Sequence, residues 1–256
     1  MDLKLPKSWY EITVDQFIEL KSESIADFQS IVQYRMDQLF IITNTDIDNE
    51  FWDIPAEELD GIIKSLEWMN SQPTLNFKKN LNEDLFFKDL KTTTIGEFLD
   101  LEYWFSINYI EKLPMICAIL YRRNRLNEWK HTIIEPRDYD TLERAEVFYD
   151  LKITDVYGVI DSFISFKKNF VDKYSNHFEE KEPELKEGEE IVYETIEQKD
   201  IEQKEKIIKK WNWERLIYQF AKDYRMQYLD VLDLPLIFFF NQLSMKEDLK
   251  AAKINI

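Results

Sequence analysis

The sequence predicts a mainly α-helical protein: a single multi-helical fold with one small β-hairpin near residues 75–90 and an acidic insert before a C-terminal helical segment. Apolar residues recur at helical spacing through most of the 256 residues. Only one stretch changes to a period of two. Glycine occurs only four times, which disfavours tight turns and glycine-rich loops. We therefore expect a helical body over 1–178, a flexible acidic connection over 179–205 and a helical segment over 206–256.

The first predicted helix begins after Thr13. Thr13 can cap the helix, with Gln16 three residues later as its reciprocal partner, and Val14 and Phe17 begin a helical apolar spacing. Trp9 precedes the cap, where an apolar side chain can pack back onto the helix. We favour the interpretation that Trp9 pins this helix to the body over the alternative that it docks to another subunit.

The remaining elements follow from spacing and turn chemistry. Residues 74–90 form the predicted hairpin, because short apolar runs flank the turn-forming "NLNED". Residues 126–140 look irregular. Helical spacing predicts further helices over 24–42, 54–70, 95–110, 112–123, 141–151 and 153–174, and two more over 207–220 and 231–248.

Charge limits the partners. The formal net charge is −17, which disfavours binding to nucleic acid and to anionic membranes. Residues 120–130 hold three Arg and one Lys; we interpret them as a solvated helix end, with a small basic binding patch as the alternative. Residues 179–205 carry twelve acids and four lysines, and so much charge argues against an independent core.

No catalytic or cofactor motif stands out. Cys117 lies in an apolar run, and the two histidines, His131 and His177, have polar, loop-like neighbours. Glycine-rich nucleotide-binding motifs and metal-ligand spacings are missing from the sequence. We therefore expect no enzymatic site, no cofactor and no metal. The N-terminal residues hold no apolar run typical of a signal peptide, and "LPLIFFF" is too short to span a bilayer.

Both ends of the chain are rich in aromatic residues, which dominate interface energies when buried at the centre of a contact. The alternative is that both ends fold back onto one core. Of three consecutive Phe residues in a helix, at least one should point away from the main helix contact, because they are about 100° apart. The candidate interface residues are Trp9, Tyr10, Phe17, Trp211, Trp213, Phe238, Phe239 and Phe240.

Several segments together resemble a known group of proteins. They are "LPKSWYEITVDQF", "TTTIGEFLDLEYW", "KLPMICAILYRR" with the later "YDTLERAEVFYDLKITDVYGVIDSFISF", and "NWERLIYQFAKDYRMQYLDVLDLPLIFFFNQLSMKED". In this order they resemble small helical virion or assembly proteins of tailed bacteriophages of Bacteroidetes, especially the crAss-like phages. The resemblance implies a virion location, with host cytoplasm during assembly. The implied partners are portal, tail-barrel or ring proteins, or further copies of the chain.

Three functional hypotheses remain open. The resemblance implies a non-enzymatic virion protein, either internal cargo of the capsid or tail or a component of the portal–tail region. The second hypothesis is a tail-assembly chaperone that is absent from the mature particle. The third is a soluble carboxylate-dependent enzyme or regulator. The resemblance implies no catalytic residues.

Overall fold

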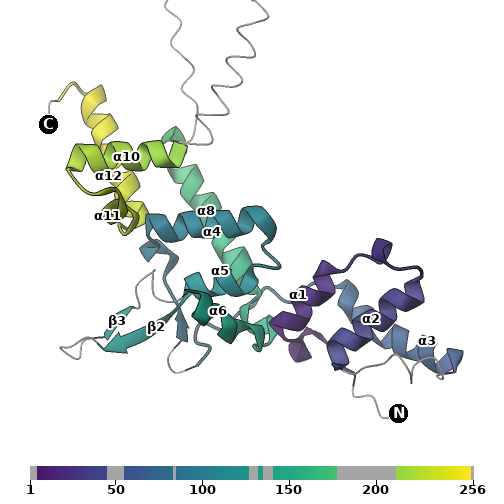
Figure 1. The fold of residues 1–256 in the computed structure, drawn as a ribbon. Coiled ribbons are helices and arrows are strands. Elements are labelled where there is room, and N and C mark those ends of the chain that lie inside the picture. Colours follow the sequence, from purple (N-terminus) through teal and green to yellow (C-terminus); the bar gives the residue numbers. More distant parts are fainter. Residues whose placement is uncertain are drawn as a thin grey trace, which may run out of the picture. The chain divides into compact units, whose positions relative to one another are not determined.

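The structure is a computed structural model that describes residues 5–44, 55–82, 85–126, 132–134, 141–177 and 212–254. Most of these residues are helical, and the only sheet among them is small and antiparallel (Figure 1). The predicted fold class is therefore confirmed. The predicted acidic connection, 179–205, and the boundaries at 178 and 206 lie outside the described residues.

The chain divides into two compact units. One comprises Met1–Leu90 and Asp100–Phe166, and the other Lys91–Leu99 and Lys167–Ile256. Two long helices, α4 (Ile95–Asn108) and α8 (Gly158–Lys173), contribute residues to both units.

The first unit holds short helices and the sheet. Helix α5 packs on α6, and α1 packs on α2. Its helices, with 3₁₀ helices marked η, are η1 (Trp9–Glu11), α1 (Val14–Ser22), η2 (Ile25–Asp27), α2 (Ile31–Thr43), α3 (Ala56–Ser65), η4 (Glu67–Asn70), α5 (Leu113–Leu120), α6 (Thr141–Tyr149) and α7 (Ile153–Val156). The second unit holds η6 (Ser175–His177), α10 (Asn212–Tyr224), α11 (Tyr228–Leu232) and α12 (Leu236–Ala251), and η5 (Leu90–Thr92) lies at the boundary.

The sheet has three antiparallel strands in the order β1 (Leu85–Phe87), β2 (Tyr121–Leu126) and β3 (Thr132–Ile134). Within the predicted hairpin, Asn80 forms a bridge with Phe86, and the Leu81 N–H donates to the Leu85 carbonyl at 3.0 Å. The other side of β1 pairs with β2, which comes from a distant part of the sequence. The hairpin prediction thus located one strand of a larger sheet.

Several predicted elements need correction. The helix expected over 24–42 is divided into η2 and α2, and the one expected over 231–248 is divided between α11 and α12. The helix expected over 112–123 ends at Leu120, because Tyr121 adopts an extended backbone, and β2 follows directly. The Tyr121 hydroxyl donates to the Lys78 carbonyl at 2.6 Å, and its ring packs against Phe87 and Phe148. These long-range contacts favour the strand over continued helix. The region expected to be irregular, 126–140, contains β3.

Residues 9–16 are fixed to the rest of the first unit as the sequence predicted. Thr13 and Gln16 form the capping box of α1. The Val14 N–H donates to the Leu151 carbonyl at 2.8 Å, and the Ile153 N–H donates to the Ile12 carbonyl at 2.9 Å. These backbone bonds join the first turn of α1 to the segment before α7.

The core of the second unit is largely aromatic. Phe240 contacts Phe170 and Trp213 with ring centroids 5.0 and 5.6 Å apart, and Phe98 contacts the same two rings. The Leu236 N–H donates to a carbonyl of the segment before α4 at 2.8 Å, so α12 begins against residues 91–99. No described helix is both long enough and apolar enough to cross a membrane.

Candidate functional site

The aromatic pair at the N-terminus divides between core and surface. Trp9 is 5% exposed, packs edge-on against Phe17 and Trp68, and donates its indole N–H to the Ser71 carbonyl at 3.0 Å. Tyr10 is 61% exposed. Trp9 therefore anchors η1 to the first unit, and Tyr10 is the member of the pair that a partner could contact.

The C-terminal aromatic run divides in the same way. Phe239 and Phe240 are buried, whereas Phe238 is 46% exposed. The prediction that at least one of the three points away from the main helix contact is confirmed. Trp213 is half-buried against Phe240, and Trp211 lies outside the described residues.

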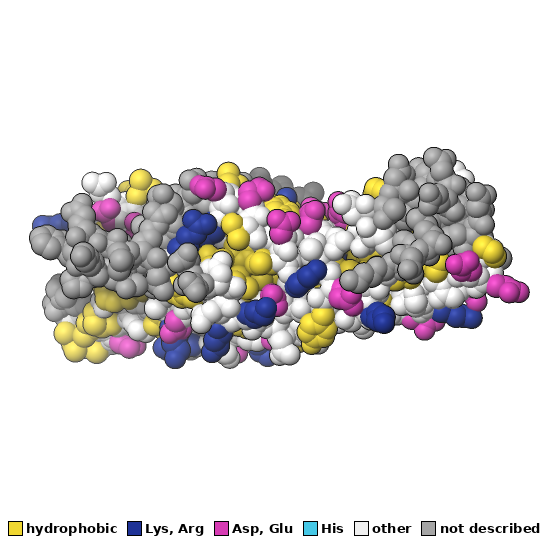
Figure 2. Space-filling model, turned by 90° about the horizontal axis from the view of Figure 1, so that it is seen from below, with side chains coloured by type: hydrophobic (Ala, Val, Ile, Leu, Met, Phe, Trp, Pro, Cys, Tyr) yellow, Lys and Arg dark blue, Asp and Glu magenta, His cyan; other side chains and the backbone are white. Residues whose placement is uncertain are grey.

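Other exposed apolar side chains were missed by the sequence reasoning. On α4, Tyr103 and Ile107 are exposed and lie one turn apart, and in the second unit Tyr218 and Leu229 are exposed. On the face seen in Figure 2, hydrophobic side chains are interspersed with acidic and basic ones. Tyr103 and Ile107 are four residues apart, so helical spacing predicts that they share one face of α4. Spacing alone does not show whether that face is covered by another element.

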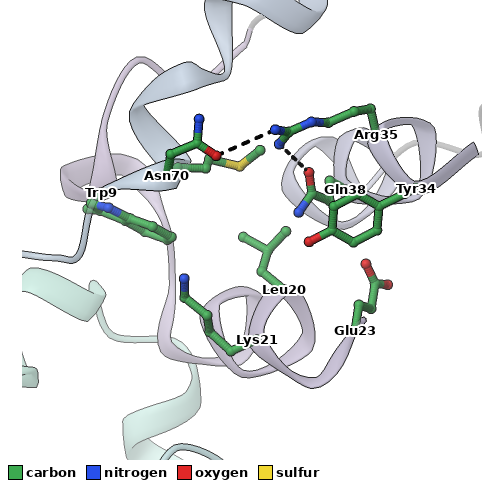
Figure 3. Close-up of a pocket in the computed structure, with 9 residues that line it drawn as sticks. Trp9, Leu20, Lys21, Glu23, Tyr34, Arg35, Gln38 and Asn70 are labelled. Carbon is green, nitrogen blue, oxygen red and sulfur yellow. Dashed lines mark hydrogen bonds between the residues drawn. The ribbon is translucent and has the colours of Figure 1, made fainter. Parts of the chain in front are cut away.

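A pocket of about 240 Å³ lies in the first unit. Figure 3 shows Leu20 at its centre, with Trp9 and Lys21 on one side and Tyr34, Arg35 and Gln38 on the other. The pocket is lined by Trp9, Leu20, Lys21, Glu23, Tyr34, Arg35, Gln38, Met69 and Asn70. Four elements and one cap supply these side chains: η1, α1 with its C-terminal cap Glu23, α2 and η4.

Two cations line this pocket. The Lys21 ammonium lies 5.5 Å from the Trp9 ring centroid, within the range of a cation–π interaction. The Arg35 guanidinium donates to the side-chain oxygen of Gln38 at 2.8 Å, with Asn70 3.5 Å away. Partial burial lowers the pKa of Lys21, because the charged ammonium loses solvation there.

The acid at the pocket, Glu23, is unusual. Burial first, and then the adjoining carboxyl of Asp37, raise the pKa of Glu23 to about 8. Glu23 caps the C-terminus of α1, where the helix dipole also disfavours a negative charge. Burial first, and then the charges of Asp15 and Asp37, raise the pKa of Glu19. At neutral pH Glu23 is therefore mostly protonated and adds little charge to the pocket.

Two buried arginines meet at the end of α5. Arg122 and Arg144 donate to the Ala118 carbonyl at 3.2 and 2.7 Å. Both side chains are buried, so the interpretation of residues 120–130 as a solvated helix end is wrong at Arg122, which belongs to β2. Positive charge at a helix C-terminus is favourable, and the bonds satisfy a carbonyl that the helix leaves free. We assign this pair a structural role at the point where α5 turns into β2.

A third polar cluster lies in the second unit. His177 Nε2 is 2.9 Å from Ser244 Oγ, and His177 Nδ1 is 3.7 Å from a Glu247 carboxylate oxygen. The order of groups is that of a nucleophilic triad. However, Ser244 lies well past the first turn of α12, where backbone N–H groups are engaged in the helix, and no oxyanion site can form from them. Sequence reasoning missed this cluster, because His177 is distant along the chain from Ser244 and Glu247.

The single cysteine is deep in the first unit. Cys117 is fully buried in α5, and burial raises the pKa of its thiol. A thiol held neutral in this way is a poor nucleophile. In the described ranges, no group of three or more His, Cys, Asp or Glu side chains has the geometry to hold a metal ion.

Comparison with known proteins adds no assignment. No protein-family model, curated protein or solved structure matches the chain.

Proposed function

We propose that the protein acts through contacts with other proteins, as a non-enzymatic component of a tailed-bacteriophage particle. One observation supports contact as the mode of action: at both ends an exposed aromatic ring adjoins a buried one. Tyr10 follows the buried Trp9, and Phe238 precedes the buried Phe239. A buried neighbour fixes the backbone that carries the exposed ring, so less backbone entropy is lost when a partner covers it.

The phage assignment rests on the sequence resemblance of five segments, which run from Leu5 to Asp248. It implies internal cargo or a portal–tail component, with portal, tail-barrel or ring proteins, or further copies of the chain, as partners. A net charge of −17 would limit adhesion to packaged DNA, since phosphate repels an acidic surface. In this proposal the protein is in host cytoplasm during assembly and in the virion afterwards.

A tail-assembly chaperone is the second candidate, and it would use the same exposed rings. Mass spectrometry of purified particles separates the two. A virion protein is retained at a fixed copy number, whereas a chaperone is absent from particles but present in lysates. The copy number also distinguishes a ring component from loose cargo.

The contact role is tested by replacing exposed rings. We expect Tyr10→Ser and Phe238→Ser to abolish incorporation into particles, while the free energy of unfolding changes by less than about 0.5 kcal/mol, as is usual for surface substitutions. Tyr103→Ser, at an equally exposed tyrosine of α4, is the matched control. Normal incorporation of both end variants would contradict the proposed contact surfaces.

A further inference from the structure

The pocket of the first unit carries positive charge without a matching acid. Lys21 lies over the rings of Trp9 and Phe17, and Arg35 is bonded only to neutral amide oxygens. Within the part of the chain that the structure describes, neither cation forms an ion pair with Asp or Glu. Two cations without such a partner on one pocket are unexpected in a chain with a net charge of −17.

The one acid that lines the pocket, Glu23, does not supply the missing charge. Glu23 is mostly protonated at neutral pH because burial and Asp37 raise its pKa to about 8. Burial lowers the pKa of Lys21, and no carboxylate raises it again. Among the side chains that line the pocket, hydrogen-bond donors and positive charge are therefore in excess.

The remaining side chains of the pocket indicate which groups a ligand would carry besides a negative charge. Leu20, Met69 and the ring of Trp9 are buried and apolar, whereas Gln38 and Asn70 are polar. A volume of about 240 Å³ is below the roughly 300–1,000 Å³ of sites for drug-sized ligands. The space suits one group of amino-acid size, and a nucleotide would not fit.

We propose that this pocket binds an organic carboxylate that carries an apolar or aromatic group. The Arg35 guanidinium and the Lys21 ammonium hold the carboxylate, and the apolar group lies against Trp9 and Leu20. A planar guanidinium matches the geometry of a carboxylate. A small free acid and the C-terminal residue of a polypeptide share this chemistry. The pocket's chemistry does not depend on the particle to which the protein belongs.

Isothermal titration calorimetry on the full chain at pH 7 tests the proposal, with N-acetylphenylalanine as the probe and N-acetylphenylalaninamide as its uncharged match. We expect the acid to bind with a Kd below about 1 mM. The amide should bind at least tenfold more weakly. Equal affinity for acid and amide, or no binding of the acid at millimolar concentration, would overturn the proposal. Inorganic phosphate that binds as tightly as the acid would also overturn it.

Protein variants locate the site. Arg35→Gln and Lys21→Gln should each weaken binding of N-acetylphenylalanine at least tenfold, with unchanged circular dichroism. Lys64→Gln is the matched control, since Lys64 is an exposed lysine of the same unit that pairs with Asp60 at 2.7 Å. An equal loss in the control would refute the pocket as the site. If either variant fails to fold, the acid–amide comparison on the unaltered chain still decides.

The two sources are separated by a third probe, a hexapeptide that ends in phenylalanine with a free carboxylate. Tighter binding of the peptide than of N-acetylphenylalanine supports the C-terminus of a polypeptide as the ligand. Binding of the free acid without binding of the peptide supports a small acid. Both results agree with the carboxylate chemistry proposed for the pocket.

Discussion

Gly158, the first residue of α8, is expected to tolerate no side chain. A Cβ there would lie 2.0 Å from the Leu75 carbonyl oxygen, 2.6 Å from the Leu75 carbonyl carbon and 2.9 Å from that of Asn76. These are backbone atoms, so no rotamer change relieves the clash. The Leu75 segment is also fixed, because the Lys78 N–H donates to the Asp155 carbonyl and the Lys78 ammonium pairs with the Asp155 carboxylate, both at 2.8 Å.

The size of the effect follows from two opposing terms. Overpacking costs about 1–3 kcal/mol, and a clash with pinned backbone belongs at the upper end. Alanine restricts the unfolded chain more than glycine does, which returns about 0.4–1 kcal/mol. We therefore expect Gly158→Ala to lower the free energy of unfolding by about 2 kcal/mol. At about 2–4 °C per kcal/mol for a chain of this size, Tm should fall by about 4–8 °C.

Gly61, inside α3, provides the control. A Cβ at Gly61 meets nothing within 4 Å. Gly61→Ala should therefore stabilise the protein by about 0.5–1 kcal/mol, because glycine is unfavourable inside a helix. Urea denaturation followed by circular dichroism measures both variants. The reasoning fails if Gly158→Ala is as stable as the unaltered protein while Gly61→Ala shows its expected gain.

Three further predictions concern single side chains. Trp9→Ala should cost about 3–5 kcal/mol of unfolding free energy, measured by urea denaturation, because it removes a buried indole; a cost below about 1 kcal/mol would place Trp9 outside the core. The raised pKa of Glu23 means that the folded state holds its proton more tightly, so stability falls as pH rises from about 4.5 to about 8. Glu23→Gln should therefore have a higher Tm than the unaltered chain at pH 8.5 and an equal Tm at pH 4; equal values at both pH values would refute this. Ser244→Ala should cost about 1 kcal/mol through the lost bond to His177, and a fluorophosphonate probe should not label the unaltered protein at Ser244.

Local features were predictable from the sequence. The capping box of Thr13 and Gln16 was recognised because both partners lie within one helical turn. Most helices were also recognised, since an apolar face repeats with the helical period. Strand β2 was missed because the contacts that hold it come from distant parts of the sequence. Tyr121 is held by Phe87, Phe148 and the Lys78 carbonyl, and none of these is near it in the sequence.

The pocket could not have been predicted in the same way. Its walls come from η1, α1, α2 and η4, and their meeting depends on how those elements pack. The sequence shows Lys21 and Arg35 as ordinary helical cations among many. It does not show that their neighbours are an indole ring and two amides. Two cations without carboxylate partners are informative because the chain as a whole is acidic.

At both ends of the chain a buried aromatic residue stands next to an exposed one, and this arrangement supports the proposed mode of action. An exposed ring on a mobile segment would lose much conformational entropy on binding, and its net contribution would be small. Tyr10 belongs to η1, which is held by the indole bond of Trp9 to the Ser71 carbonyl. Phe238 belongs to α12, which is held by Phe239 and Phe240 in the aromatic core of the second unit. The buried residues of each run therefore support a contact by fixing their exposed neighbour, and truncating them should weaken binding through lost stability.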